Sequence, residues 1–354
     1  MTQKSFFSLC AVTLVAVIAA AWAVSTRPAI EASDFDGSLV FPGLIDDLNM
    51  LSAIRIEHKD GTFTLNSTAD GWVFAERDNY PVQDDKIGEL LIKLTRMEKV
   101  EPKTELPERY DRLDLVSPAD KDDTRAKEVT LLNAAGDVIA GVLVGKRKFT
   151  LGTDEGGTYI KHPDEAQTWL VTGELTPGAR PRDWLLREVS DIKDDDIARV
   201  TITHPDGETV TVFKDAPEDA NYQVADIPAD RELRRDTIAN DSGRVLSNLL
   251  LDDVKAADSV EFPADKTIRA VFEGFAGFTV TMDLIEDGDV NWIKLTGTPP
   301  TEAPAAEAQT DWTQAIAELN ARAEGWVYQL PGYEVAGIKK RMDDFVREPE
   351  DSGV

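Results

Sequence analysis

Two stretches of alternating hydrophobic and polar residues lie far apart in the chain, and each contains an Asp-Gly pair preceded by a histidine. The letters are IEHKDG in Ile56–Gly61, followed by TFTLNS, and ITHPDG in Ile202–Gly207, followed by ETVTVF. Alternation with period two on both sides of Asp-Gly predicts a β-hairpin. A third strand is expected after each hairpin, at Trp72–Phe74 and at Tyr222–Val224. The same three-strand pattern is therefore present twice.

Apolar residues at helical spacing come after the third strand in each half. The first set is Ile87, Leu90, Leu91, Leu94 and Met97, and the second set is Val245, Leu246, Leu249, Leu250 and Val254. This spacing predicts one helix over each set. Further strands follow in both halves, and the last of them leads to a predicted helix, at Trp184–Leu186 or at Ile338–Phe345. The shared order indicates a duplicated module of about 140 residues.

The predicted fold class is α+β, with two tandem duplicated modules that have mainly antiparallel sheets and covering helices. Runs of strands between single helices argue against a doubly wound parallel sheet. The first module is expected over 51–190 and the second over 191–350, after a connector over 25–50. The Pro/Ala-rich stretch Thr296–Asp311 occurs in the second half alone, and we expect it to be an inserted loop.

An apolar run precedes both modules. Phe6–Val24 contains no charged residue and follows Lys4, and at about 1.5 Å per residue it nearly spans a hydrocarbon core of about 30 Å. Ala21–Ala23 fits the cleavage site of a secretory signal, but the run is longer than the apolar region of most signals. We therefore expect an uncleaved transmembrane helix over 1–24. The preference of positive residues for the cytoplasm then predicts a single-pass protein of the inner membrane, with most of the chain in the periplasm.

The charge balance argues against nucleic acid as a partner. Asp and Glu number 66 against 38 Lys and Arg, so the net charge is −28. Binding to a phosphate backbone needs clustered basic residues that release counterions. The sequence shows no extended stripe of Lys and Arg, and we expect no nucleic acid partner.

Residues with catalytic or metal-binding chemistry are few. The single cysteine, Cys10, lies in the apolar run, and the three histidines have no partners at ligand spacing, so neither a disulfide nor a zinc site is predicted. His58 and His204 occupy the same place in the two hairpins, where we expect exposed side chains. No catalytic, cofactor-binding or metal-binding residue is assigned. We predict that the protein is not an enzyme and takes no cofactor.

Partner contacts are expected where the two halves differ. The stretch TPGARPRDW in the first half brings together Arg180, Arg182 and Trp184 in an otherwise acidic chain. Guanidinium groups bind carboxylates through parallel hydrogen bonds, so these three residues are the candidate contacts with a partner. The alternatives are local ion pairing of the arginines with Asp183 or Glu188 and core packing of the tryptophan.

Longer stretches of the chain resemble a family of bacterial envelope proteins. The similarity is carried by FPGLIDDLNMLSAIRIEHKDGTFTL, NYPVQDDKIGELLIKL and EPKTELPERYDRLDL. The family is the domain of unknown function DUF4340, usually encoded beside ABC-transporter genes of the gliding-motility type. Asp114 stands where the family commonly has Gly, which places a tight turn there in question. The resemblance implies an anchored accessory of an export system.

These observations predict a membrane-anchored extracytoplasmic interaction protein without catalytic activity. Its partners would be the membrane, through the N-terminal helix, and an ABC-transporter permease or an associated envelope protein. The alternative is an extracytoplasmic module that binds a glycan or a lipid in the groove between the two modules.

Overall fold

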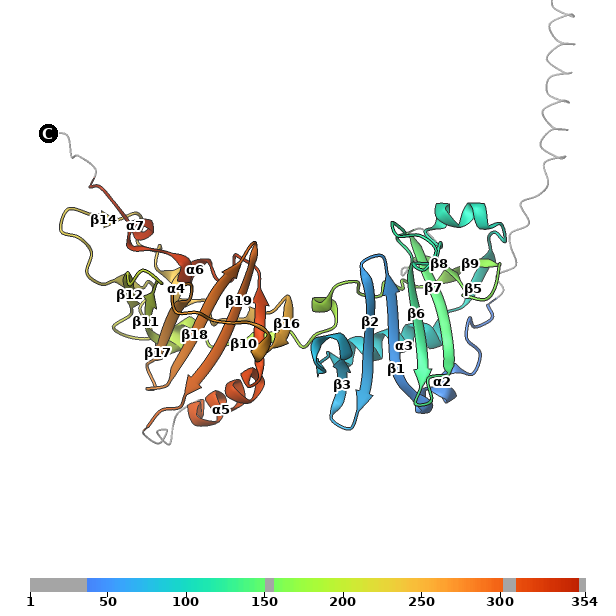
Figure 1. The fold of residues 1–354 in the computed structure, drawn as a ribbon, viewed down its shortest axis with the longest axis horizontal. Coiled ribbons are helices and arrows are strands. Elements are labelled where there is room, and N and C mark those ends of the chain that lie inside the picture. The colour runs from blue at the N-terminus through green and yellow to red at the C-terminus, as the bar shows by residue number, and fades with distance from the viewer. Residues whose placement is uncertain (1–36, 150–155, 302–309, 350–354) are drawn as a thin grey trace, which may run out of the picture. The chain divides into compact units, whose positions relative to one another are not determined.

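The computed structural model describes residues 37–149, 156–301 and 310–349 (Figure 1). The transmembrane helix predicted over 1–24 lies outside these residues, as does the middle of the predicted insertion. Within the described residues, no helix is both long enough and apolar enough to cross a membrane.

The chain divides into two compact units. The first contains Ile87–Pro177 and the chain up to Thr62, and the second contains Phe63–Lys86 and the chain from Gly178 onward. Both consist mainly of antiparallel strands with a few helices. The predicted α+β class with mainly antiparallel sheets is therefore confirmed.

Strands from the first half of the chain form a nine-stranded sheet in the order β4-β3-β2-β1-β6-β7-β8-β9-β5. They are β1 (Leu51–His58), β2 (Gly61–Thr68), β3 (Gly71–Phe74), β4 (Tyr80–Pro81), β5 (Lys99–Pro102), β6 (Lys127–Asn133), β7 (Val138–Lys148), β8 (Gly157–Lys161) and β9 (Thr168–Thr172). Ile54 and Ile56 are buried and Arg55 between them is partly exposed, because successive side chains of a strand point to opposite faces. The first predicted hairpin is confirmed as β1 and β2.

Strands from the second half form an eight-stranded sheet in the order β13-β12-β11-β17-β18-β19-β20-β16. They are β11 (Ile197–Thr203), β12 (Thr209–Phe213), β13 (Gln223–Val224), β16 (Asp253–Ala256), β17 (Ile268–Gly274), β18 (Thr279–Asp287), β19 (Val290–Thr298) and β20 (Trp326–Leu330). Two short pairs are separate from this sheet: β10 (Glu188–Ser190) with β15 (Leu249–Leu250), and β14 (Glu232–Leu233) with β21 (Val346–Arg347). The second predicted hairpin is confirmed as β11 and β12.

The two sheets have the same strand order. Apart from β4, the order β3-β2-β1-β6-β7-β8-β9-β5 corresponds position by position to β13-β12-β11-β17-β18-β19-β20-β16. In each sheet the first hairpin strand, β1 or β11, pairs with a strand that comes much later in the chain, β6 or β17. Among the strands of each sheet, the one that precedes this partner in the chain, β5 or β16, lies at the far edge of the sheet.

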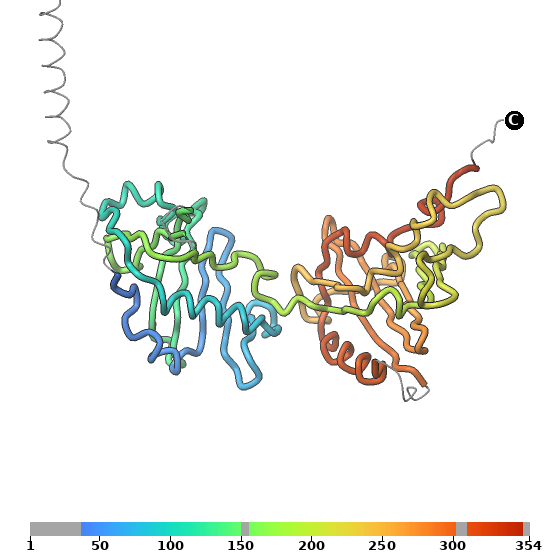
Figure 2. The backbone as a smooth tube through the Cα atoms, turned by 180° about the vertical axis from the view of Figure 1, so that it is seen from behind, coloured from blue at the N-terminus to red at the C-terminus, as the bar shows by residue number. Residues whose placement is uncertain are grey.

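The longer helices occur in different connections of the two sheets. α3 (Asp84–Arg96) follows β4, whereas α5 (Trp312–Ala323) lies between β19 and β20. Figures 1 and 2 both show α3 against one face of the first sheet. The helix predicted from Ile87 onward is confirmed as α3, but the periodicity did not predict α5. The short helical segments are α2 (Leu44–Asp47), α4 (Asn240–Gly243), α6 (Ala336–Lys339), α7 (Met342–Phe345), η1 (Leu48–Met50), η2 (Ala75–Arg77), η3 (Pro107–Leu113), η4 (Pro181–Asp183), η5 (Asp194–Asp196) and η6 (Ala257–Ser259).

The helix predicted over Val245–Val254 is wrong. The helical turn in this region, α4, ends at Gly243, and the chain then forms the short strands β15 and β16. Asn248 has a left-handed backbone with φ 51, a conformation that ends helices rather than continuing them. Four of the five apolar residues are buried all the same, and Leu250 is partly buried, because an irregular segment can turn side chains inward without a helical period.

The helices predicted at the two module ends also differ from the structure. Trp184–Leu186 is not helical: η4 ends at Asp183, and Leu185 then forms a β-bridge with Val82. The predicted helix over Ile338–Phe345 is divided into α6 and α7, because the chain between them is extended. The helical spacing therefore identified mainly buried side chains here, although Leu186 is exposed, and it did not indicate one continuous helix.

The turn at Asp114 is tight although the residue is not glycine. Its backbone is left-handed, with φ 54, and its N–H donates to the carbonyl of Asp111 at 3.2 Å. Asp tolerates this region better than most residues with a side chain. The turn that the glycine of the family implies is therefore retained.

α5 lies close to β19 at Gly297. The side chain of Asn320 accepts a hydrogen bond from the N–H of Gly297 at 2.7 Å and donates one to its carbonyl at 2.9 Å. A Cβ at Gly297 would lie 2.7 Å from a methyl group of Ile316. The absence of a side chain therefore lets the helix approach the strand.

We predict that Gly297→Ala lowers the free energy of unfolding by about 1–3 kcal/mol, because the added methyl group forces α5 away from β19. Denaturant-induced unfolding measures this change. Thr296→Ala is the control, since Thr296 is the exposed neighbour and surface changes usually cost less than about 0.5 kcal/mol. Equal stability of the two variants would show that the close approach does not stabilise the fold.

Candidate functional site

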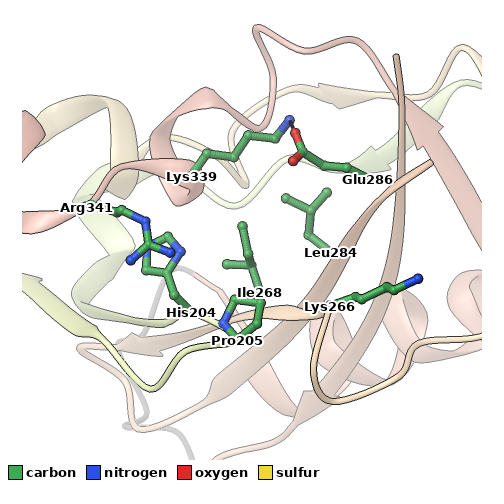
Figure 3. Close-up of a pocket in the computed structure, with 8 residues that line it drawn as sticks. All are labelled: His204, Pro205, Lys266, Ile268, Leu284, Glu286, Lys339 and Arg341. Carbon is green, nitrogen blue, oxygen red and sulfur yellow. Dashed lines mark hydrogen bonds and ion pairs between the residues drawn. The ribbon is translucent and has the colours of Figure 1, made fainter. Parts of the chain in front are cut away.

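A pocket of about 260 Å³ opens at one end of the second sheet (Figure 3). Its lining residues are His204, Pro205, Lys266, Ile268, Leu284, Glu286, Lys339 and Arg341. They come from the β11–β12 turn, the beginning of β17, the end of β18 and the chain around α6 and α7. Antiparallel pairing brings the first three segments together, because Thr203 lies opposite Arg269 and Ile268 lies opposite Leu284.

Aliphatic side chains form the middle of the pocket. Leu284 is fully buried and its register partner Ile268 is partly buried. Figure 3 shows both between the charged side chains, with Pro205 below them. An apolar group placed here would be removed from water, which favours its binding.

His204 forms one wall of the pocket and is held by the backbone. The ring is only 4% exposed, and its Nε2 lies 3.1 Å from the carbonyl oxygen of Lys340. Because a carbonyl can only accept, Nε2 carries the proton and donates. The histidine therefore ties the end of β11 to the chain between α6 and α7.

Arg341 binds two carboxylates of the β11–β12 turn. Its Nη1 donates to Asp206 at 2.8 Å and to Glu208, and the N–H of Met342 donates to Glu208 at 2.8 Å. The Met342 N–H, and after it the guanidinium, hold the pKa of Glu208 below its ordinary value. Both side-chain bonds use one nitrogen, and within the described residues Nε and Nη2 make no hydrogen bond.

The two lysines of the pocket differ in how they are paired. The amine of Lys339 donates to the carboxylate of Glu286 and to the side-chain oxygen of Asn291. Figure 3 shows this amine beside Glu286 and away from Arg341. Lys266 is exposed at the rim and has no ion pair within the described part of the chain.

The lining of this pocket is basic although the chain is acidic. It contains three residues with positive charge and one with negative charge, whereas the whole chain has a net charge of −28. Exposed charges farther away than about 10 Å are largely screened at physiological ionic strength. The nearby groups therefore decide the local potential, and Asp206 and Glu208, which bind Arg341, balance the excess positive charge of the lining.

A second pocket, of about 460 Å³, lies in the first unit. Arg55, Glu128, Asp164 and Glu165 are its charged lining residues, together with His162. Burial raises the pKa of Glu128 above its ordinary value. Acids outnumber bases here, so the two pockets differ in charge.

The expectation that both hairpin histidines are exposed is wrong. His58 is 6% exposed and His204 is 4% exposed. The N–H of Asp60 donates to Nδ1 of His58 at 3.2 Å, and burial lowers the pKa of His58. Both rings are buried at the ends of equivalent strands, which hairpin periodicity could not reveal because it does not show what covers the turn.

The three predicted contact residues have different surroundings. Arg182 forms an ion pair with Asp252 at 2.9 Å, which raises the pKa of its guanidinium. Trp184 is buried, and its Nε1 donates to the carbonyl of Gly178 at 3.2 Å. Arg180 pairs with Asp183 at 3.2 Å, and its side chain stays 62% exposed. Of the three, Arg180 is the residue most accessible to a partner.

The sequence pattern did not identify the pocket residues. They come from four segments that only the sheet brings together. One signal was available: Lys339–Arg341 are three consecutive basic residues in an acidic chain.

Within the described residues, no group of three or more His, Cys, Asp or Glu side chains could hold a metal ion.

Fold and pocket together define an α+β protein with two antiparallel sheets of one strand order and a basic pocket in its second unit. The chain belongs to the family described as Domain of unknown function (DUF4340), whose model matches residues 72–269, more than half of the 354 residues. The match runs from β3 to β17 and so includes strands of both sheets. No curated protein and no solved structure matches the chain. The family resemblance is confirmed, and the association with gliding-motility genes stays a prediction.

We predict that His204→Ala lowers the free energy of unfolding by about 1–3 kcal/mol, because it removes a buried ring and leaves the carbonyl of Lys340 without its donor. Chemical denaturation measures the loss. Lys266→Ala serves as the control at the exposed rim of the same pocket and should change stability by less than about 0.5 kcal/mol. A His204 variant as stable as this control would contradict the structural role of the ring.

Proposed function

We propose that the protein is an envelope-anchored interaction protein that holds or recognises a component of an ABC-type export system and catalyses no reaction. The observation that carries the proposal is the uncharged apolar run Phe6–Val24 behind Lys4, followed by a strongly acidic chain. A run of this length suits a membrane helix. A basic residue before the run favours retention of that end in the cytoplasm, with the rest of the chain in the periplasm.

Membership of a family of unknown function is compatible with this role. The shared strand order of the two sheets supports an origin by internal duplication, since independent sheets would seldom share eight strand positions. A duplicated sheet provides two similar scaffolds whose connections can diverge. The helices α3 and α5 occur in different connections, so we infer that the halves have acquired different surfaces.

The test is isolation of the tagged full-length protein from native membranes after mild cross-linking, followed by mass spectrometry. The proposal predicts a permease of the ABC type, or a protein encoded with one, as a reproducible companion. The matched control has the apolar run replaced by a cleavable secretory signal, so that the same acidic chain is released into the periplasm. This control should lose most of the companion, because anchoring raises the effective concentration at the membrane.

Recovery of the full-length chain without any transporter component would contradict the proposed partner. Release of the full-length chain from membranes by alkaline carbonate would contradict the anchor. The two results are separate, since a partner can be lost while the anchor remains.

A second candidate function is an extracytoplasmic ligand-binding module. The specific observation in its favour is the basic pocket of about 260 Å³ in the second unit. The glycan or lipid site expected in a groove between the modules stays a prediction.

A further inference from the structure

We propose that the pocket of the first unit binds the ammonium group of a primary amine with a short hydrocarbon chain. The carboxylate of Glu128 would accept a hydrogen bond from the ammonium, and Phe41 and Val138 would contact the hydrocarbon. The site goes beyond the anchored interaction function, and it gives the ligand-binding alternative a place in the first unit and a ligand class. A free amine and the side chain of a lysine on a peptide share this chemistry.

The strand register leaves a hollow on one face of the first sheet. Arg55, Thr130 and Gly141 are successive register partners across β1, β6 and β7, so they share this face. Gly141 has no side chain, which leaves space at the middle of the row. A Cβ at Gly141 would lie 3.3 Å from Pro163, so the chain after β8 closes one side. The volume of about 460 Å³ lies within the usual range of about 300–1,000 Å³ for small-molecule sites.

Glu128 is a partly buried carboxylate beside this hollow. It lies two positions from Thr130 on β6, so its side chain is on the same face. The hydroxyl of Ser117 donates to its Oε2 at 3.1 Å, and within the described residues Glu128 makes no ion pair. Burial raises its pKa, and Glu57, its register partner on β1, adds to the rise. A cation beside Glu128 would stabilise its charged form, because opposite charges attract more strongly where water is partly excluded.

The positive charge of Arg55 is balanced by a neighbour. Its Nε lies 3.0 Å from the carboxylate of Glu57, two positions along the same strand and on the same face. No ion pair joins Arg55 to Glu128 in the part of the chain that the structure describes. Arg55 therefore leaves Glu128 without a direct counter-ion.

Lys161 is the other base on this face, and its donors are occupied. Its Nζ donates to three backbone carbonyls at 2.9 Å each, those of His162, Pro163 and Glu165. An ammonium group has three N–H bonds, so none remains for Glu128. In the register Leu143 lies between Glu128 and Lys161, which places their backbones two strand spacings, about 10 Å, apart. The buried lysine fixes one wall of the pocket and does not fill the place of a ligand.

The charge that remains around the hollow is negative. The acids of the lining and its neighbouring positions are Glu57, Glu128, Asp164 and Glu165, and the bases are Arg55 and Lys161. Four carboxylates thus stand against two cations, even after the pair of Arg55 with Glu57 is counted. This excess favours a ligand with a positive charge over an anion.

The remaining walls favour hydrocarbon next to the ammonium. Val138 is 62% exposed at the beginning of β7, and Ile139 and Phe41 are partly exposed. The ring of Phe41 is packed edge-on against His162, with the centroids 5.1 Å apart. A ligand that covers these side chains removes hydrocarbon from water. An alkyl chain of a few carbons therefore suits the site better than a bare metal ion.

The experiment is isothermal titration calorimetry of the full-length protein in nanodiscs of zwitterionic lipid, with empty nanodiscs as the blank. Pentylamine is the probe, and pentan-1-ol is the neutral analogue of the same length. We expect the alcohol to bind at least about tenfold more weakly, which is the effect of losing a hydrogen bond between charged groups. Magnesium ions should bind more weakly than pentylamine, because they gain nothing from the hydrocarbon walls.

Two variants that remove one negative charge test where the amine binds. Glu128→Gln should weaken pentylamine binding at least about tenfold and leave pentan-1-ol binding unchanged, because glutamine keeps the shape of the side chain and loses its charge. Glu108→Gln is the matched control: Glu108 is an exposed residue of η3 in the same unit and does not line the pocket. The control should bind pentylamine as the unaltered protein does. Thermal unfolding verifies that both variants fold.

Nα-acetyl-lysine amide distinguishes the two sources of the ammonium group. Tighter binding than pentylamine supports a lysine of a peptide as the ligand, and weaker binding supports a free amine. The proposal is overturned by equal binding of amine and alcohol, by magnesium binding as tight as that of pentylamine, or by equal weakening in the two glutamine variants. None of these outcomes depends on recovery of a transporter component, so failure here is distinct from failure of the anchored function.

Discussion

Each sheet depends on one long-range antiparallel pair, β1 with β6 and β11 with β17. The entropy lost on closing the chain between such strands rises only slowly with its length, so the intervening segments can differ without loss of the pair. In the first half that segment carries α3, and in the second it is mostly irregular. The β11–β17 pair also creates the pocket, because its register brings the end of β11 beside the beginning of β17.

Sequence patterns predicted correctly the elements that are stabilised by interactions between residues close together in the chain. The two hairpins follow from period-two alternation around Asp-Gly, and α3 follows from a helical apolar stripe with acids in its first turn and bases in its last, which complements the helix dipole. The second predicted helix failed because inward-facing apolar residues do not require a helical backbone, and the left-handed Asn248 ends the preceding turn. α5 depends on its contact with Gly297, a tertiary feature that spacing does not show.

The pocket could not be predicted for the same reason. His204 appeared to be a turn residue on a surface, but the later chain at Lys340 covers it, and the carbonyl of Lys340 accepts a hydrogen bond from its ring. Arg341 appeared as one of three consecutive bases, and its chemistry comes from Asp206 and Glu208, more than a hundred residues earlier. The register of the paired strands and the packing of the later chain over the hairpin thus determine which charged side chains lie together. Composition gives only the acidic net charge of the whole chain.

The most direct test of this account is a disulfide across the β11–β17 pair. Thr201 and Val271 are register partners, and opposite residues of an antiparallel pair lie within disulfide reach. In a chain with Cys10→Ser, mass spectrometry should detect the disulfide for T201C combined with V271C. T201C combined with A270C should stay reduced, because neighbouring residues of a strand point to opposite faces. Cross-linking of the second pair in preference to the first would contradict the register and the position of the pocket.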